Sequence, residues 1–375
     1  MKDMNICTVE ECFYQIRNGV NIKQGTEDGG YPITRIETTA NDKFNRDRMG
    51  YAGITDLEKY KSYVLEDGDL LMSHINSVQY LGRTVLYKKQ GKEKIIHGMN
   101  LLVLKARRNI IRPAYARYYC YSRPFIEQIG RITKKSVNQA SFAVADLKKI
   151  KICVPDLSIQ DRVIDILDLV NQIIEERQQE LLQLDELIKA RFVEMFGDPI
   201  TNSMKLPTER IDKRYFLKAG ITTSSEDIHD YSKGKYEIPC YGGNGIRGYV
   251  EEKSYEGEYP IIGRQGALCG NVQLASGAFH ATEHAVLVSI IKGDNIVWTY
   301  HMLKLMDLYR YHTGAAQPGL AVKTLNAIDV IVADISRQNQ FAGFVKQVDK
   351  LKVAVQKALD ETQVLFENLM QKYFG

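Results

Sequence analysis

Two short motifs have the residue types of enzymatic sites. The first, "GNGIRG" (243–248), matches G-x-G-x-x-G, in which the last glycines open a helix whose N-terminus holds a pyrophosphate. The residues after it hold Tyr, Val, Gly and Pro at short spacing, with no apolar period of 3.6 residues. They predict a turn and a short strand, so the helix that a dinucleotide site needs is missing.

The second motif, "HATEH" (280–284), matches the inverted zinc-protease pattern H-x-x-E-H. That pattern needs a helix to place both histidines on one face. The following "AVLVSII" is β-branched and predicts a strand, along which residues four apart lie about 13 Å apart. No third ligand, P-loop or G-x-S-x-G elbow is evident, and the six cysteines form no C-x-x-C. We therefore expect a binding protein with no catalytic residue, cofactor or metal of its own. An enzyme that uses either motif is the less favoured alternative.

Length and composition indicate the number of domains and the class of protein that contain these motifs. A chain of 375 residues predicts two domains, and 44% hydrophobic with 26% charged residues is typical of soluble globular proteins. No apolar run has the length of a membrane span and no signal peptide is recognisable, so we expect a cytoplasmic protein. Residues 105–135 hold nine bases and one acid, a stretch that can neutralise the phosphates of a polyanion. The alternative is a solvated basic face whose four intervening tyrosines turn to the core.

The chain repeats itself. "NQASFAVADLKKIKICVPDLSIQ" (138–160) aligns without a gap with "AQPGLAVKTLNAIDVIVADISRQ" (316–338), an offset of 178 that also carries "MFG" (195–197) onto "YFG" (373–375). Upstream, "YQIRNG" (14–19) resembles "YFLKAG" (215–220), and the two copies differ by 23 residues in between. This pattern predicts one scaffold that carries two different inserted surfaces.

Each copy ends in a long helix. Ser158 is the expected N-cap of the first helix, with Asp161 in its first turn, and Gly197 and Pro199 end it. Residues 158–196 hold nine acids and four bases, and residues 336–374 hold four acids and six bases, so we expect the two helices to pair with each other. The alternative is that each helix packs only on its own domain. At about 1.5 Å per residue each rod is roughly 58 Å long. The predicted seam residues, at 4-3 spacing, are Val163, Leu167, Val170, Ile174, Leu181, Leu184, Ile188 and Met195 in the first helix, and Phe341, Val345, Val348, Val355, Leu359, Phe366, Leu369 and Tyr373 in the second.

The motifs together resemble a known family. "YGGNGIRGYV" (241–250), "YPIIGRQGALCGNV" (259–272), "ATEHAVLV" (281–288) and the "Q…L…I.I.VP.LS.Q" pattern before each helix are similar to the DNA-specificity subunit of type I restriction–modification systems. The second copy departs from this pattern, because "PDL" before the first helix becomes "ADI", with Ala333 in place of the proline. The resemblance implies an α+β fold, with two pseudo-repeated globular α/β target-recognition domains separated by two long helices that pair as an antiparallel coiled coil. The implied boundaries are 1–155 for the first recognition domain, 156–198 for the first helix, 199–333 for the second domain and 334–375 for the second helix.

The resemblance also implies a function. Each recognition domain would read one half of a bipartite, asymmetric site in double-stranded DNA. The helices would recruit adenine methyltransferase subunits, expected to be two, and restriction subunits would join them. S-adenosylmethionine, ATP and Mg²⁺ are expected in those partner subunits, and none in this chain. A non-catalytic coiled-coil adaptor that binds only proteins is the alternative.

Polar residues on Gly-rich or short loops are the expected DNA contacts, because direct readout needs hydrogen-bonding side chains on loops that a rigid scaffold presents. "SHINSVQ" (73–79) stands in the first domain where "GRQGALC" (263–269) stands in the second. Gln139 and Gln317 occur in both copies and are expected to support the scaffold. For each candidate the alternative is an ordinary surface or loop residue. The candidates are His74, Asn76, Ser77 and Gln79 for bases and Lys134 and Lys135 for phosphates in the first domain, and Asn244, Arg247, Arg264, Gln265 and Thr282 in the second.

Overall fold

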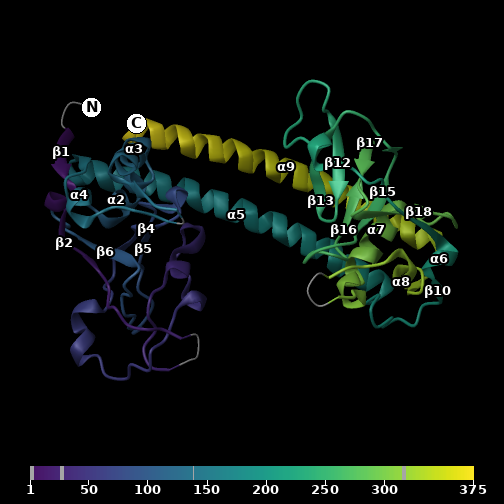
Figure 1. The fold of residues 1–375 in the computed structure, drawn as a ribbon, viewed down its shortest axis with the longest axis horizontal. Helices are drawn as coiled ribbons and strands as arrows, with labels where there is room; N and C mark the ends of the chain where they lie inside the picture. Colours follow the sequence, from purple (N-terminus) through teal and green to yellow (C-terminus); the bar gives the residue numbers. More distant parts are fainter. Residues whose placement is uncertain (1–3, 26–28, 138, 315–317) are drawn as a thin grey trace. The chain divides into compact units, whose positions relative to one another are not determined.

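The computed structural model describes residues 4–25, 29–137, 139–314 and 318–375, which form two compact units (Figure 1). Unit 1 consists of Met1–Glu176 and Leu359–Gly375, and unit 2 of Arg177–Ala358. Each unit thus contains part of each long helix. The expected limits of the recognition domains, 1–155 and 199–333, stay a prediction. Gln317 lies outside the described residues.

The two long helices are copies of one element. Helix α5 spans Leu157–Phe196 and helix α9 spans Ile335–Phe374, so both ends are offset by 178 residues. The carboxylate of Asp334 caps α9 by accepting the N–H of Ser336 at 2.8 Å. Since α5 begins at Leu157, the prediction of Ser158 as its N-cap is wrong. Asp156, the counterpart of Asp334, holds the position before the first helical residue.

The helices pair antiparallel, which each unit shows by itself. In unit 1, Val163 near the start of α5 shares a core with Phe374 at the end of α9. In unit 2, Phe192 near the end of α5 shares a core with Phe341 near the start of α9, their ring centroids 5.4 Å apart. Lys352 of α9 also donates to Asp185 of α5 at 2.6 Å. This contact is of the kind expected between two helices with opposite net charges. The prediction of two α/β units with mutually paired helices is confirmed.

A four-stranded antiparallel sheet forms the centre of each unit, with the same strand order. In each sheet the first strand in sequence pairs with the last one, the last pairs with the second, and the second pairs with the third. In unit 1 the order is β2 (Phe13–Asn18), β6 (Leu101–Ala106), β3 (Leu70–Ser73) and β5 (Thr84–Leu86). In unit 2 it is β11 (Tyr215–Ala219), β18 (Ala285–Ile290), β15 (Tyr259–Gly263) and β16 (Val272–Ala275).

The elements around the sheets repeat as well. A short strand at the start of each copy pairs antiparallel with the strand that leads into the long helix. Short helices flank these pairs. In unit 1 the elements are β1 (Met4–Thr8), α1 (Val9–Cys12), α2 (Pro113–Cys120), α3 (Arg123–Ile132), α4 (Val144–Lys148) and β9 (Lys151–Pro155). In unit 2 they are β10 (Thr208–Arg210), α6 (Ile211–Arg214), α7 (Ile296–Leu305), α8 (Val322–Leu325) and β19 (Asp329–Ile331).

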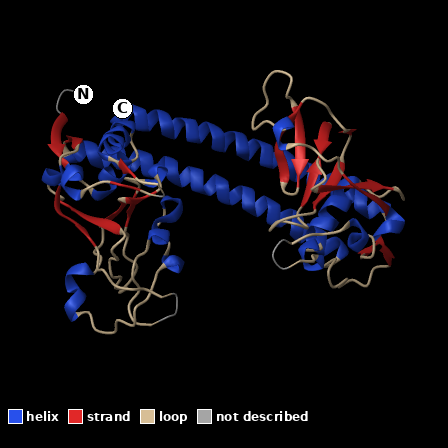
Figure 2. Cartoon of the chain, viewed as in Figure 1, coloured by secondary structure: helices blue, strands red, loops and turns tan. Residues whose placement is uncertain are grey.

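The inserted surfaces differ between the units. Figure 2 shows the insert of unit 1 mainly as loop with short 3-10 helices, and that of unit 2 as strands. Unit 1 carries η1 (Ile36–Asp42), η2 (Arg46–Arg48), η3 (Glu58–Tyr63) and η4 (Val78–Tyr80), and a small sheet of β4 (Ile75–Asn76), β8 (Ala140–Ser141) and β7 (Lys134–Lys135). Unit 2 carries η5 (Ser225–Asp227), η6 (Leu308–Tyr311) and a second sheet of β13 (Gly245–Val250), β12 (Ile238–Gly242), β17 (Ala278–Ala281) and β14 (Tyr255–Glu256). The prediction of one scaffold with two unlike inserts is confirmed.

Neither enzymatic motif has the structure that its chemistry needs. Gly243 and Asn244 of "GNGIRG" lie in the turn between β12 and β13, and its other four residues belong to β13, so Gly248 lies inside a strand instead of opening a helix. His280 lies in β17, where its Nε2 bonds to Thr223 Oγ1 at 2.8 Å and its Nδ1 to Ser254 Oγ. The strand predicted after "HATEH" is β18. The described part of the chain contains no cluster of three His, Cys, Asp or Glu side chains placed to hold a metal.

The basic stretch 105–135 does not form one basic face. Lys105 is buried and pairs with Asp69 at 3.0 Å and with Glu66 at 2.8 Å. Arg112 pairs with Asp161 of α5 at 2.8 Å. Tyr115, Tyr118 and Tyr119 are buried in the core of unit 1. This agrees with the alternative interpretation of the stretch, in which its tyrosines turn to the core. Within the described ranges, no helix combines the length and apolar character needed to cross a bilayer.

Candidate nucleic-acid interface

Three loops of unit 2 converge at the end of its central sheet. Gly263, at the end of β15, lies so close to the "GNGIRG" turn that a Cβ there would come within 1.9 Å of the carbonyl oxygen of Gly243. The next residue, Arg264, donates its N–H to the carbonyl of His284 at 2.8 Å. Glycine at 263 therefore permits a contact that joins the 243–245 turn, the 264–270 loop and the 281–284 loop.

Four of the five polar candidates of unit 2 lie on or beside this loop cluster with accessible side chains. Asn244, Arg247 and Gln265 are exposed, and Arg264 is half-buried. Side-chain contacts within the unit hold three of them in place: Asn244 Oδ1 accepts from Asn271 Nδ2 at 2.6 Å, Arg247 Nη2 donates to Ser225 Oγ at 2.9 Å, and Arg264 Nη1 donates to the Glu283 carbonyl at 3.3 Å.

Thr282 is the exception in unit 2. It has no exposed surface, and its N–H donates to the carbonyl of Tyr241 at 2.9 Å. This burial favours a role in supporting the loop cluster over a direct contact with a nucleic acid.

The loop that follows β3 in unit 1 (74–82) occupies the place of the 264–270 loop of unit 2, as the sequence predicts, and we call each of these segments the recognition loop of its unit. His74 follows β3 as Arg264 follows β15, and its carbonyl accepts from Phe142 N–H at 3.3 Å. The carbonyl of Arg264 accepts from Leu320 N–H at 2.8 Å, and Phe142 and Leu320 differ by the offset of the repeat.

The small sheet of unit 1 brings together candidates that are far apart in sequence. Asn76 of β4 and Lys135 of β7 both pair with Ala140 of β8, one from each side. With strands about 4.8 Å apart, these two residues lie about 10 Å from each other. Lys134 and Lys135 are exposed, as are Ser77 and Gln79, and Asn76 is half-buried. A base-reading candidate and a phosphate-binding candidate thus share one surface.

His74 is buried, with 5% of its surface exposed. Its ring lies edge-on to Phe142, with the centroids 6.3 Å apart, and burial lowers the pKa of the imidazole because the charged form is poorly solvated. Like Thr282, His74 is better placed to support its loop than to touch DNA.

A groove of about 510 Å³ beside this loop contains residues that the sequence analysis missed. Arg83 extends over it, held by Asp42 at 3.0 Å and stacked on Tyr80 with its guanidinium carbon 5.1 Å from the ring centroid. None of the three belongs to a motif, and only the fold brings residue 42 to residue 83. The lining residues are Ile36, Glu37, Thr39, Ala40, Asn41, Asp42, Ser73, Asn76, Gln79, Tyr80 and Arg83.

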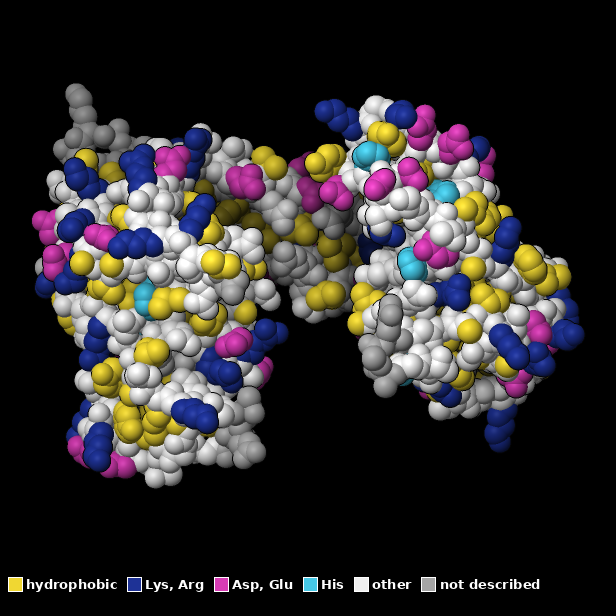
Figure 3. Space-filling model, viewed as in Figure 1, with side chains coloured by type: hydrophobic (Ala, Val, Ile, Leu, Met, Phe, Trp, Pro, Cys, Tyr) yellow, Lys and Arg dark blue, Asp and Glu magenta, His cyan; other side chains and the backbone are white. Residues whose placement is uncertain are grey.

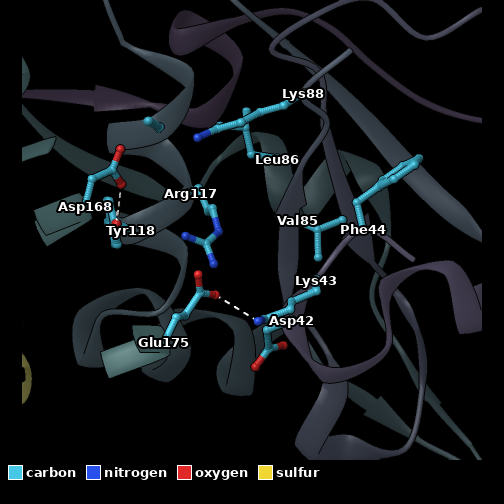
Figure 4. Close-up of a pocket in the computed structure, with 11 residues that line it drawn as sticks. Asp42, Lys43, Phe44, Val85, Leu86, Lys88, Arg117, Tyr118, Asp168 and Glu175 are labelled. Carbon is cyan, nitrogen blue, oxygen red and sulfur yellow. Dashed lines mark hydrogen bonds and ion pairs between the residues drawn. The ribbon is translucent and has the colours of Figure 1, made fainter. Parts of the chain in front are cut away.

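The insert of unit 1 is tied to the long helix. Figure 4 shows Lys43 reaching Glu175 of α5 across a pocket of about 270 Å³, and the two charged groups are 2.8 Å apart. On the other wall, Tyr118 of α2 donates to Asp168 of α5 at 2.5 Å. The Lys43–Glu175 pair is exposed, so it contributes at most about 1 kcal/mol.

Charge alone does not mark the interface. Figure 3 shows Lys and Arg side chains scattered among acidic and neutral ones on the drawn face of both units. DNA recognition by the loops of the two units would therefore depend on individual hydrogen-bonding side chains. Single basic side chains such as Lys134 and Lys135 would make the phosphate contacts.

Sequence comparison identifies relatives over most of the chain. Residues 1–184 and 215–362 match the family described as type I restriction modification DNA specificity domain. The EcoprrI type I restriction enzyme specificity subunit of Escherichia coli is 38% identical over 248 residues, 62% of this chain and 60% of the relative. A putative MjaX specificity subunit of Methanocaldococcus jannaschii is 34% identical over 196 residues, 52% of this chain and 46% of the relative. The matched segments thus span about half to three fifths of these relatives' lengths.

Solved structures share the fold. The S subunit of a type I restriction–modification system from M. genitalium superposes with a TM-score of 0.60 at 15% identity, over 100% of this chain and 96% of that one. A chain from a study of complex assembly and conformational transition of the type I R-M system gives 0.57 at 14% identity, over 100% and 98%. These likenesses concern the fold alone. The repeated scaffold, the paired helices and the family match lead to one conclusion: the chain belongs to the type I restriction–modification DNA specificity family, whose members are non-catalytic specificity subunits.

Proposed function

We propose that this chain reads a bipartite, asymmetric DNA sequence for a type I restriction–modification complex. The loop cluster of each unit reads one half-site in double-stranded DNA. The long helices recruit two adenine methyltransferase subunits, and restriction subunits join that assembly in the cytoplasm. S-adenosylmethionine, ATP and Mg²⁺ serve the partner subunits.

The observation that carries this proposal is the repeat itself. Two copies of one sheet order present loops at equivalent positions, while the inserts beside those loops differ in fold. A pseudo-twofold protein of this kind suits two half-sites, and unlike inserts suit unlike half-sites. The exposed candidates of both units have the side-chain types that read base edges or bind phosphates.

The outer faces of the long helices support the recruitment of partners. Leu169, Leu182 and Leu187 of α5 are 46–59% exposed, and Val353 of α9 is 71% exposed. These exposed apolar side chains are available for contact with another protein along the helices. We propose that the methyltransferase subunits cover them.

The direct test exchanges one recognition surface. Residues 201–332 are replaced by the corresponding residues of a relative, and methylated adenines are mapped by sequencing host DNA. We expect one half of the methylated sequence to change and the other half to stay. A change in both halves would refute the modular reading, and a chain that supports no sequence-specific methylation would point to a protein-binding adaptor.

Single substitutions test the candidate readers. Arg247→Ala and Arg264→Ala should each relax one base position at a cost of about 1–3 kcal/mol, whereas Lys134→Ala should weaken binding to all sequences alike. Competition between target and random duplexes measures both effects. Equal losses on target and random DNA for Arg247→Ala and Arg264→Ala would remove them as base readers.

A further inference from the structure

Arg83 and Asn271 occupy the same position on the repeated scaffold. Each directly precedes the strand that follows the recognition loop, β5 in unit 1 and β16 in unit 2. The Ser73 N–H donates to the Arg83 carbonyl at 2.9 Å, and the Gly263 N–H donates to the Asn271 carbonyl at 2.9 Å. The backbone bonds that place the two residues are therefore the same.

A side chain of the insert holds each of these two residues. Arg83 Nη1 donates to the carboxylate of Asp42 at 3.0 and 3.3 Å, and Asn271 Nδ2 donates to Asn244 Oδ1 at 2.6 Å. The inserts differ in fold, yet both deliver a polar partner to the same scaffold position. Asp42 is held at a φ of 58°, in the left-handed region that non-glycine residues rarely adopt. Such strain persists where the surroundings over-determine a conformation, often at ligand-binding sites.

These contacts leave part of the hydrogen-bonding capacity of both side chains unused, and Arg83 lines the groove of unit 1. Arg83 Nε donates to the Gln79 carbonyl at 3.1 Å, and Nη2 has no hydrogen-bond partner among the described residues. The Arg83 side chain is 43% exposed. Asn271 retains its carbonyl oxygen and its second amide hydrogen. Each side chain is thus oriented by its partner and still able to bind a ligand.

We infer that Arg83 and Asn271 each read one base, a guanine in the half-site of unit 1 and an adenine in that of unit 2, with Asp42 and Asn244 as positioning residues. Guanine offers the O6 and N7 acceptors that a guanidinium matches, and adenine offers the N6 donor and N7 acceptor that a carboxamide matches. The carboxylate of Asp42 neutralises Arg83, which disfavours a phosphate as its ligand and favours a base edge. This inference rests on the proposed function and adds to it a residue-level reason for unlike half-sites.

The experiment uses the full chain purified with its methyltransferase subunits and a duplex library in which each target position is varied. Arg83→Ala should flatten the guanine preference at one position of one half-site, with discrimination falling by about 5- to 150-fold. Asn271→Ala should do the same for an adenine in the other half-site. Asp42→Asn should weaken the preference at the Arg83 position alone. Arg123→Ala is the matched control, because Arg123 is 88% exposed on α3 and its one ion pair among the described residues is with Glu127 of its own helix.

The outcomes separate the inference from the function it rests on. A wild-type complex with a clear target, whose preferences Arg83→Ala and Asn271→Ala leave unchanged or lower evenly at all positions, overturns the inference alone. A wild-type complex without any sequence preference overturns the proposed function. If Arg83→Ala does not assemble, Arg83→Lys keeps the charge and removes the planar fork, and it should relax the same position.

Discussion

The most informative perturbation of the scaffold is Asp294→Ala. The Asp294 carboxylate is 3% exposed and accepts from Arg214 Nη2 at 2.5 Å, from Tyr215 Oη at 2.9 Å and from Gln338 Nε2 at 2.8 Å. Burial alone would raise the pKa of Asp294, but these donors outweigh burial and keep the pKa below its usual value. The carboxylate therefore joins the sheet of unit 2 to the start of α9.

The cost of Asp294→Ala follows from the charge left behind. The Arg214 side chain is 10% exposed and keeps one other carboxylate, Glu209, at 3.1 Å. Breaking a buried pair by removing one partner costs about 3–5 kcal/mol, and because Glu209 compensates in part we expect the lower end, about 3 kcal/mol. The contribution is complete at pH 7 and is lost only as the pH falls below the unfolded-state value of about 4, through the lower folded pKa.

The assay is urea unfolding at pH 7 followed by tryptophan fluorescence. Trp298 is the only tryptophan of the chain and lies fully buried in the core of unit 2, so its signal reports on that unit. Asp212→Ala is the control, since it removes a partly exposed pair with Arg210, whose side chain is 53% exposed, and should cost about 1 kcal/mol or less. The double change Arg214→Met with Asp294→Leu should recover much of the loss, because it leaves no unpaired buried charge. A loss for Asp294→Ala no larger than that of the control would refute the reasoning.

Three further predictions concern the units separately. His97 is 1% exposed, and burial lowers its pKa to about 4. Because its unfolded pKa is about 6.5, unit 1 should lose up to about 3 kcal/mol of stability as the pH falls from 6.5 to 4, and His97→Gln should flatten that dependence in pH-dependent unfolding. Gly263→Ala would place a Cβ 1.9 Å from a backbone oxygen, so we expect about 1–3 kcal/mol of destabilisation and weaker discrimination in one half-site, whereas Gly343→Ala, with nothing within 4 Å, should not destabilise. Gln160→Ala removes the partner of three backbone groups and should cost about 1–3 kcal/mol, seen as faster hydrogen exchange in unit 1 only; unchanged exchange would contradict it.

Local patterns in the sequence were sufficient to predict the helices and strands that the two copies share. The apolar spacing and the repeat predicted α5 and α9, whose ends keep one offset. The lack of a helical period over 246–262 predicted a turn and a short strand, and the β-branched run after His284 predicted another strand; β13, β15 and β18 confirm strands in both segments. These features depend on residues close together in the chain, whose backbone preferences and periodicity can be seen without the fold. The N-cap of α5 was misplaced because Asp156 and Ser158 are both good caps two residues apart.

The candidate site was only partly accessible from sequence. The sequence predicted that the recognition loops of the two units occupy equivalent positions in the repeat. It also named His74 and Thr282 as residues that read bases, although both are buried. It missed Arg83 because the partner that orients this side chain, Asp42, lies 41 residues away. A polar residue on a loop has the same local signature whether it faces solvent or the protein interior.

Sequence alone thus determined the repeat, the two long helices, the strand-and-turn nature of the enzymatic motifs and the family. Only the tertiary structure decided which charged side chains form internal ion pairs, such as Lys105 with Asp69. It also decided which polar side chains lie on one surface, such as Asn76 and Lys135. The physical reason is range. Helix periodicity and turn chemistry act over a few residues, whereas burial and pairing depend on strands that the chain brings together from dozens of residues apart.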